Sequence, residues 1–224
     1  MILYTMSEDE IRKEISQETL EIKFHIEQCM DKFKKANKNR LPRMYPTLAF
    51  YSFTTRRKND ILLLLEANEY KRRNCPHYGV YFITQFHKVY QCTTFGDDDQ
   101  DIIVFTKHFL KRYNERMNLH YTNKIDVLKH FITNNASSAI KFDSENPNMF
   151  YGTITTGMTF GYRKDSGFTY QTTFVDNTKL FANQTEYVNA IKDKVNLTDI
   201  RDVMKRMINH DYECLNTISI PKKE

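Results

Sequence analysis

The clearest pattern along the chain is a run of apolar positions at helical spacing near its beginning. Between residues 7 and 38, apolar side chains recur every three or four positions, at Ile11, Ile15, Ile22, Ile26, Cys29 and Phe33. Ser7 is a favoured N-cap residue, and Glu10 follows three positions later, as in a capping box. The pattern predicts one long helix that ends near Pro42 and packs on the rest of the chain, although its spacing would also suit a partner helix.

Residues 47–105 carry the aromatic and β-branched side chains that strands favour. Strands are predicted over residues 48–54, 78–84 and 88–95. The apolar run Ile61–Leu65 fits a buried strand, although Asn59 and Asp60 could cap a helix there. The acidic run Asp97–Asp99 is expected to be a polar turn, because three consecutive carboxylates rarely converge on one metal ion.

Helices follow over residues 106–119 and 123–135, with Thr106 as the cap of the first. Three strands are then predicted over residues 150–154, 158–164 and 168–175. The linkers Thr155–Gly157 and Asp165–Gly167 each have three residues and end in glycine, which is typical of a type I turn followed by a left-handed glycine. The register that follows pairs Tyr162 with Tyr170, Phe160 with Thr172, Met158 with Phe174 and Ile154 with Met158. It also places Arg163 and Thr173 on one polar face.

These elements define an α+β fold with an antiparallel sheet that includes a three-stranded C-terminal meander. The sheet is packed by helices, including the long N-terminal helix, and two more helices are predicted near residues 184–194 and 199–210. Two regions are expected, 1–97 and 98–224, which could form one compact unit. The first region combines the N-terminal helix with β structure and has no assigned role.

Charge and composition limit where the protein is expected to reside and which partners it is expected to bind. No apolar run approaches the ~18–20 residues of a membrane helix, no secretion signal is visible at the N-terminus, and the four cysteines form no closely spaced pair. We therefore expect a cytoplasmic protein with free thiols and no membrane partner. The net charge is +5, with basic clusters at residues 32–43, 56–58, 71–73 and 107–116. Each cluster could be a solvated face, but together they favour a phosphate-rich partner.

The helix predicted over residues 106–119 carries the most suggestive polar set. His108, Arg112 and Arg116 lie four residues apart and share one helix face with Glu115. A histidine can move a proton near neutral pH, and arginines can hold a phosphate and stabilise transition-state charge. RNA supplies its own nucleophile, so no metal or cofactor is needed. The alternative is an exposed helix in which Glu115 pairs with Lys111 or Arg112.

The order of elements over residues 100–182 resembles the small ribonuclease-toxin domains of the RelE and BrnT type. The resemblance rests on Phe105-Thr-Lys-His108 with Arg112 and Glu115-Arg116, and on Phe160-Gly-Tyr-Arg163 with Thr172-Thr-Phe-Val175. It implies a metal-independent endoribonuclease with His108, Arg112, Arg116 and Thr173 as catalytic residues. It further implies that Arg163, Lys107 and Lys111 bind the RNA substrate and that a neutralising protein partner exists. The alternative is a non-catalytic module on the same scaffold that binds nucleic acid or protein, to which residues 1–96 would contribute.

Overall fold

The computed structural model describes residues 1–84, 88–92, 101–135, 138–143 and 145–179. Met1–Thr178 form one compact unit, which includes described residues on both sides of the boundary expected between residues 97 and 98. The acidic run Asp97–Asp99 and the two helices predicted near residues 184–194 and 199–210 lie outside the described residues.

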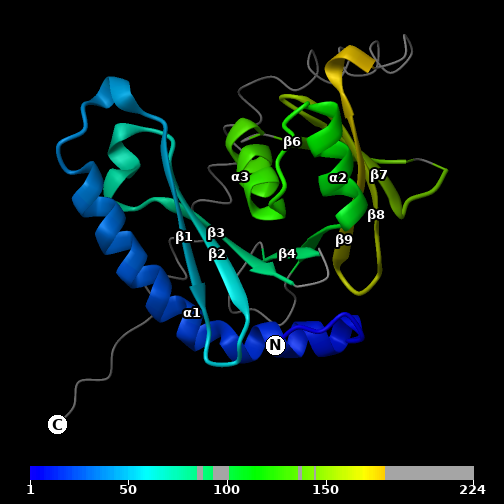
Figure 1. Ribbon diagram of the computed structural model, residues 1–224, viewed down its shortest axis with the longest axis horizontal. Helices are drawn as coiled ribbons and strands as arrows, with labels where there is room; N and C mark the ends of the chain where they lie inside the picture. The colour runs from blue at the N-terminus through cyan, green and yellow to red at the C-terminus, as the bar shows by residue number, and fades with distance from the viewer. Residues whose placement is uncertain (85–87, 93–100, 136–137, 144, 180–224) are drawn as a thin grey trace. The chain divides into compact units, whose positions relative to one another are not determined.

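The described residues confirm the α+β class and the long N-terminal helix (Figure 1). With η denoting a 3₁₀-helix, the elements in chain order are α1 (Glu8–Asn37), η1 (Pro42–Met44), β1 (Thr47–Thr54), β2 (Asp60–Ala67), η2 (Tyr70–Asn74), β3 (His77–Ile83), β4 (Val89–Cys92), β5 (Ile102–Phe105), α2 (Lys107–Arg116), α3 (Lys124–Asn134), β6 (Ser138–Phe142), β7 (Met149–Ile154), β8 (Gly157–Arg163), β9 (Phe168–Asp176) and η3 (Asn177–Lys179).

One nine-stranded sheet, in the order β1-β2-β3-β4-β5-β9-β8-β7-β6, connects the two halves of this unit. All neighbouring strands are antiparallel except β5 and β9, which pair in parallel. The chain leaves β5 through α2 and α3, forms β6 to β8, and returns through β9 beside β5. The strands β7, β8 and β9 therefore belong to a larger sheet, which β6 extends at one edge.

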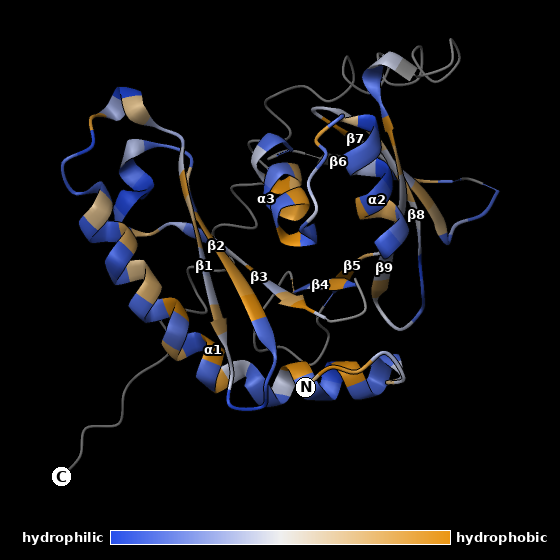
Figure 2. Ribbon diagram, viewed as in Figure 1, coloured by the Kyte–Doolittle hydropathy of each residue, from blue (hydrophilic) through white to orange (hydrophobic). Residues whose placement is uncertain are grey.

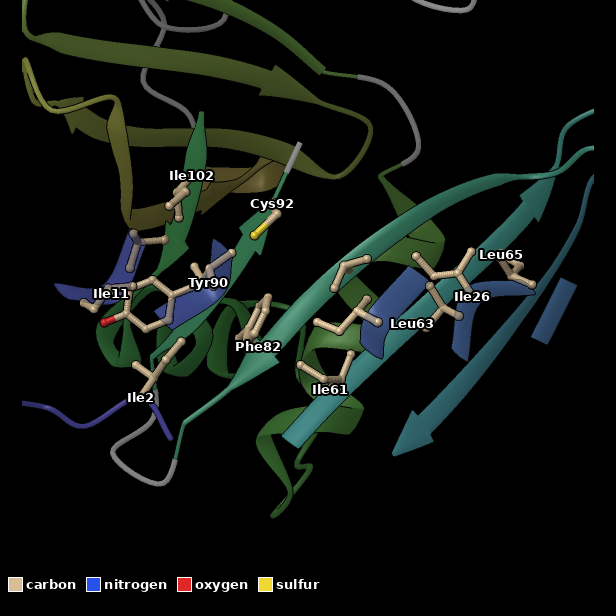
Figure 3. Close-up of a cluster of buried hydrophobic side chains, with 14 of the residues drawn as sticks. Ile2, Ile11, Ile26, Ile61, Leu63, Leu65, Phe82, Tyr90, Cys92 and Ile102 are labelled. Atoms are coloured by element: carbon tan, nitrogen blue, oxygen red, sulfur yellow. The ribbon is translucent and has the colours of Figure 1, made fainter. Parts of the chain in front are cut away.

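The sheet is buried on both faces around β2. Ile61, Leu63 and Leu65 pack in the core under α1 (Figure 3). Leu62 and Leu64 pack in a second core with α2 and α3. Successive side chains of a strand point to opposite faces, so a central strand between two helical layers is apolar at every position. This explains why β2 is the strongly hydrophobic strand in Figure 2 and confirms the strand predicted over Ile61–Leu65.

Helix α1 begins as its sequence predicts. The Ser7 hydroxyl accepts a hydrogen bond from the Glu10 backbone N–H at 3.3 Å, and the Glu10 carboxylate accepts one from the Ser7 N–H at 2.7 Å. This reciprocal capping box satisfies two backbone donors that the first turn would leave free. The apolar positions of α1, including Ile15, Ile22 and Phe33, are fully buried against the sheet. In the described structure, these apolar side chains of α1 therefore pack in the core.

The two glycine-ended turns differ from each other. Gly167 has the left-handed φ of 81° that the three-residue linker predicts, and its N–H donates to the Lys164 carbonyl at 3.0 Å. The same prediction is wrong for Gly157, which is the first residue of β8 and pairs with Ile154 across a two-residue turn. A Cβ at Gly157 would lie 2.0 Å from the Val175 carbonyl oxygen. Glycine is required at this position because there is no room for a Cβ, and not because of its backbone conformation.

A β-bulge changes the register between β8 and β9. Tyr162 pairs with Tyr170 as predicted, but Phe160 pairs with Thr173 and Met158 with Val175, each one position beyond the expected partner. Thr172 is the extra residue, and its hydroxyl donates to the Phe160 carbonyl at 3.0 Å. The predicted pairs of Phe160 with Thr172 and of Met158 with Phe174 are therefore wrong. The predicted pair of Ile154 with Met158 is wrong for a separate reason, because the two-residue turn pairs Ile154 with Gly157.

Candidate nucleic-acid interface

Helix α2 presents one apolar and one basic face. The Thr106 hydroxyl accepts from the Phe109 N–H at 3.2 Å and caps the helix, as predicted. Phe109, Leu110 and Tyr113 are buried against the sheet and α3. The remaining positions project polar side chains, of which those that are exposed are Lys107, His108, Lys111, Arg112 and Glu115.

Two of the predicted site residues on α2 touch each other. The Arg112 Nε donates to His108 Nε2 at 3.3 Å, and both side chains are exposed. A guanidinium can only donate, so this contact requires an unprotonated Nε2 on His108. Lys111 and Glu115 form an exposed ion pair at 3.7 Å, which is the ordinary pairing that the alternative interpretation of this helix expects.

Arg116 is engaged in a different contact. Its guanidinium donates to the backbone carbonyl of Phe174 in β9, and the side chain is half-buried. The arginine thereby ties the end of α2 to the sheet. Its partner is a main-chain oxygen, so in this arrangement it fixes the helix on β9 and does not join the His108–Arg112 pair.

Arg163 and Thr173 are separated from each other and from His108. Tyr170 packs in the core under α1 and Phe174 in the core with α2 and α3, because the bulge at Thr172 reverses the alternation of β9. Thr173 therefore faces the α1 side. Arg163 follows Tyr162, which packs on the α1-side core, so Arg163 faces the other side. The prediction that these two side chains share a face is wrong.

The Arg163 guanidinium is occupied locally. It forms an ion pair with Asp101 at 2.7 Å, just before β5, whereas His108 lies just after β5. The predicted set is thus divided into the His108–Arg112 pair, Arg116 on the Phe174 carbonyl, Arg163 on Asp101, and Thr173 on the opposite face.

The structure gathers basic residues elsewhere, at the end of the fold where α1 finishes. Helix η2 is in contact with α1, and Figure 1 shows it beside the C-terminal end of that helix. Helix η1 is the next element after α1. We call residues 30–44 and 69–75 the basic end. Its nine cationic residues are Lys32, Lys34, Lys35, Lys38, Arg40, Arg43, Lys71, Arg72 and Arg73.

The basic end holds all of the chain's net positive charge. Its nine basic and two acidic residues, Asp31 and Glu69, give a net charge of +7, whereas the whole chain carries +5 and the remainder is therefore net negative. The nearby segments are anchored by Asn37, which is buried, donates to the Phe33 carbonyl at 2.8 Å and accepts from the Thr47 hydroxyl at 3.2 Å. Two segments that are separated by 24 residues in sequence thus form one positive surface.

Aromatic side chains lie among these charges. The Arg73 guanidinium sits 3.9 Å from the centroid of the Tyr70 ring, and the Tyr45 ring packs edge-on against Tyr70 at 5.8 Å. Leu41 and Met44, in the η1 part of the basic end, are half-exposed. Proteins bind single-stranded nucleic acids with basic side chains, which contact the phosphates, and with aromatic rings, on which the bases stack. Both basic runs are visible in the sequence. The structure adds that they lie together, which separate solvated faces would not do.

Other classes of site find no support in the part of the chain that the structure describes. Within those residues, no group of three or more His, Cys, Asp or Glu side chains is placed to hold a metal ion. Likewise, none of the described helices combines the length and hydropathy that crossing a membrane requires. Comparisons with protein-family models, with curated proteins and with solved structures find no match to this chain.

Proposed function

We propose that this protein is a non-catalytic RNA-binding module whose basic end grips the phosphate backbone. The observation that supports the proposal is the net charge of +7 on two converging segments of a chain that carries +5 in total. Lysine and arginine that neutralise phosphates release condensed counterions, so they supply affinity without reading sequence. Tyr70, backed by Arg73, adds a ring on which a base can stack.

The test is binding of a fluorescent single-stranded RNA, measured by anisotropy at two salt concentrations. Three phosphate contacts to a single strand predict that affinity falls about 20-fold between about 50 and 200 mM salt. The variant Lys35→Glu/Lys38→Glu/Lys71→Glu changes three exposed cations of the basic end, and we expect it to abolish binding and its salt dependence.

The matched control reverses the same number of charges on α2, with Lys107→Glu, Lys111→Glu and Arg112→Glu. These side chains are exposed as well, so the net charge changes equally while the basic end stays intact. Binding should survive in this control. Loss of binding in the α2 variant, with binding retained in the basic-end variant, would move the interface to α2 and overturn the proposal.

A metal-independent endoribonuclease is the second candidate, and the contact between Arg112 and His108 favours it. If Arg112 leaves His108 Nε2 and binds the scissile phosphate, the freed Nε2 could accept the 2′-hydroxyl proton of RNA while Arg112 holds the phosphate. Under this candidate, purified protein should cleave mixed RNA in EDTA, and His108→Ala and Arg112→Ala should each abolish cleavage. If the wild-type protein leaves the RNA intact, the endoribonuclease candidate is excluded. Only this candidate implies a neutralising protein partner.

A further inference from the structure

Helix α1 carries two apolar side chains on the side that faces away from the sheet. Leu20 is 84% exposed, more than any other large apolar side chain that the structure describes, and Phe24 is 58% exposed. They lie four residues apart, so they are neighbours on the helix surface. The side of α1 that faces the sheet is the opposite one, where Ile11 and Ile22 are buried (Figure 1). Adjacent apolar side chains that remain in water indicate a surface for another molecule.

Leu20 and Phe24 lie in the middle of a longer exposed stripe of α1. We call it the outer stripe, and its six exposed residues are Lys13, Gln17, Leu20, Phe24, Glu27 and Asp31. A helix turns by about 100° per residue, so these positions fall within a sector of about 80° on the helix surface. Their steps of four and three residues are those of a seam along which two helices pair. The outer stripe therefore has the geometry to meet a second helix, with an apolar centre and charged ends.

The charges of the outer stripe complement those of a second copy that runs in the opposite direction. If two α1 helices lie antiparallel with Leu20 of one copy level with Phe24 of the other, Lys13 of each copy is level with Asp31 of the other. A parallel pair would place Lys13 beside Lys13 and Asp31 beside Asp31, and like charges on neighbouring helix positions are destabilising. The sequence of the stripe therefore favours an antiparallel pair over a parallel one.

The same register overlaps the two helices along almost their whole length. It is centred on the middle of α1, whose bounds are Glu8–Asn37. Gln17 is then level with Glu27 of the other copy, and Asp9 is level with Lys35; all four side chains are exposed. The positive end of each helix dipole also meets the negative end of the other. One register thus aligns the apolar centre, the charges and the ends of the helices.

We propose that a second copy of this chain binds along the outer stripe, so that two α1 helices pair in antiparallel orientation about a two-fold axis. In such an interface every contact occurs twice. Its apolar centre has only two leucine and two phenylalanine side chains, so we expect a dimer that forms at about 100 µM and dissociates near about 1 µM. The dimer does not depend on RNA, and it would carry one basic end at each extremity of the helix pair.

The experiment measures sedimentation velocity of the full chain without RNA, with a reductant that excludes disulfide-linked dimers. The wild type should pass from monomer to dimer between about 1 and 100 µM. Leu20→Gln/Phe24→Gln replaces two exposed side chains with a good helix former, and it should weaken the dimer at least about tenfold. Leu41→Gln makes the same change at a leucine that is 50% exposed and lies outside α1, and it should dimerise as the wild type does.

A charge exchange tests the register itself. Lys13→Glu alone, or Asp31→Lys alone, places like charges level at two points of the dimer, and each should weaken it about fivefold at low salt. The double variant Lys13→Glu/Asp31→Lys restores opposite charges at both points and should restore the dimer. The two residues are about 27 Å apart along their own helix, so the recovery can only arise between chains.

The outcomes decide the inference without reference to RNA binding. A wild type that stays monomeric at about 100 µM overturns it, as does a dimer that persists in Leu20→Gln/Phe24→Gln. Single charge variants that dimerise normally, or a double variant that stays as weak as the single ones, overturn the antiparallel register and with it the proposal. A wild type that dimerises but binds no RNA would leave this inference standing while the proposed function fails.

Discussion

At the scale of single residues, the carboxylate of Glu14 on α1 is held by several hydrogen bonds. It is 5% exposed, accepts from Arg57 Nη2 at 2.6 Å and Nε at 3.2 Å, and accepts from Asn59 Nδ2 at 3.0 Å. The Arg57 hydrogen bonds are the largest cause that lowers its pKa from 4.5 to about 2. These contacts fasten the turn between β1 and β2 to the N-terminal part of the long helix.

This carboxylate predicts an acid-dependent loss of stability. Because folding depresses its pKa, its contribution is complete above pH 4.5 and is lost as the pH falls toward 2. We expect about 2 kcal/mol, below the full linkage value because Arg57 is half-exposed. Urea unfolding of the wild type across this range should show the loss, and Glu14→Gln should flatten it. Glu27→Gln, on the exposed side of α1, should leave the slope unchanged.

At the scale of elements, the sequence was most informative where an element's own residues determine it. The start of α1 follows from Ser7 and Glu10, and the cap of α2 from Thr106, because each hydrogen bond joins near neighbours. Strand β6 was missed, since its exposed Ile140 and Phe142 belong to an edge that only its pairing with β7 defines. The bulge in β9 was missed for a related reason: an extra residue is defined by the partner strand.

A substitution at Gly161 tests whether the register shifts at the bulge between β8 and β9. A Cβ there would lie 1.9 Å from the Tyr170 carbonyl oxygen and 2.6 Å from the Phe150 ring, so Gly161→Ala must displace backbone at the register shift. We expect a loss of at least about 3 kcal/mol in the free energy of unfolding. Gly167→Ala, the matched substitution at the left-handed turn position, should cost about 1–2 kcal/mol. Equal costs in urea unfolding would contradict this account of β8 and β9.

At the scale of the whole molecule, the candidate sites depend on contacts that no linear pattern contains. His108 and Arg112 were predicted to lie together and do, because one helical turn separates them. Arg163 and Thr173 were predicted to share a face and do not, because that depends on the register of two strands. The basic runs at residues 32–43 and 71–73 were both visible in the sequence, but the return of the chain through β1 and β2 brings them together.

Concentrating a charge of +7 at one end of the fold must cost stability, and the cost should depend on salt. At about 10 mM ionic strength the Debye length is about 30 Å, so the cations of the basic end repel one another, whereas at about 1 M it is about 3 Å and the repulsion is screened. The triple variant Lys35→Glu/Lys38→Glu/Lys71→Glu should therefore be more stable than the wild type at low salt, by about 1 kcal/mol. The advantage should vanish at high salt.

The α2 variant with Lys107→Glu, Lys111→Glu and Arg112→Glu is the control for net charge. It changes the total charge by the same amount, but it also reverses the ion pair of Lys111 with Glu115, so it should not gain stability at low salt. Urea midpoints of the three proteins at both salt concentrations make the comparison. If both variants gain equally at low salt, the repulsion belongs to the net charge of the whole chain, and the basic end is not the concentrated field on which RNA binding is proposed to depend.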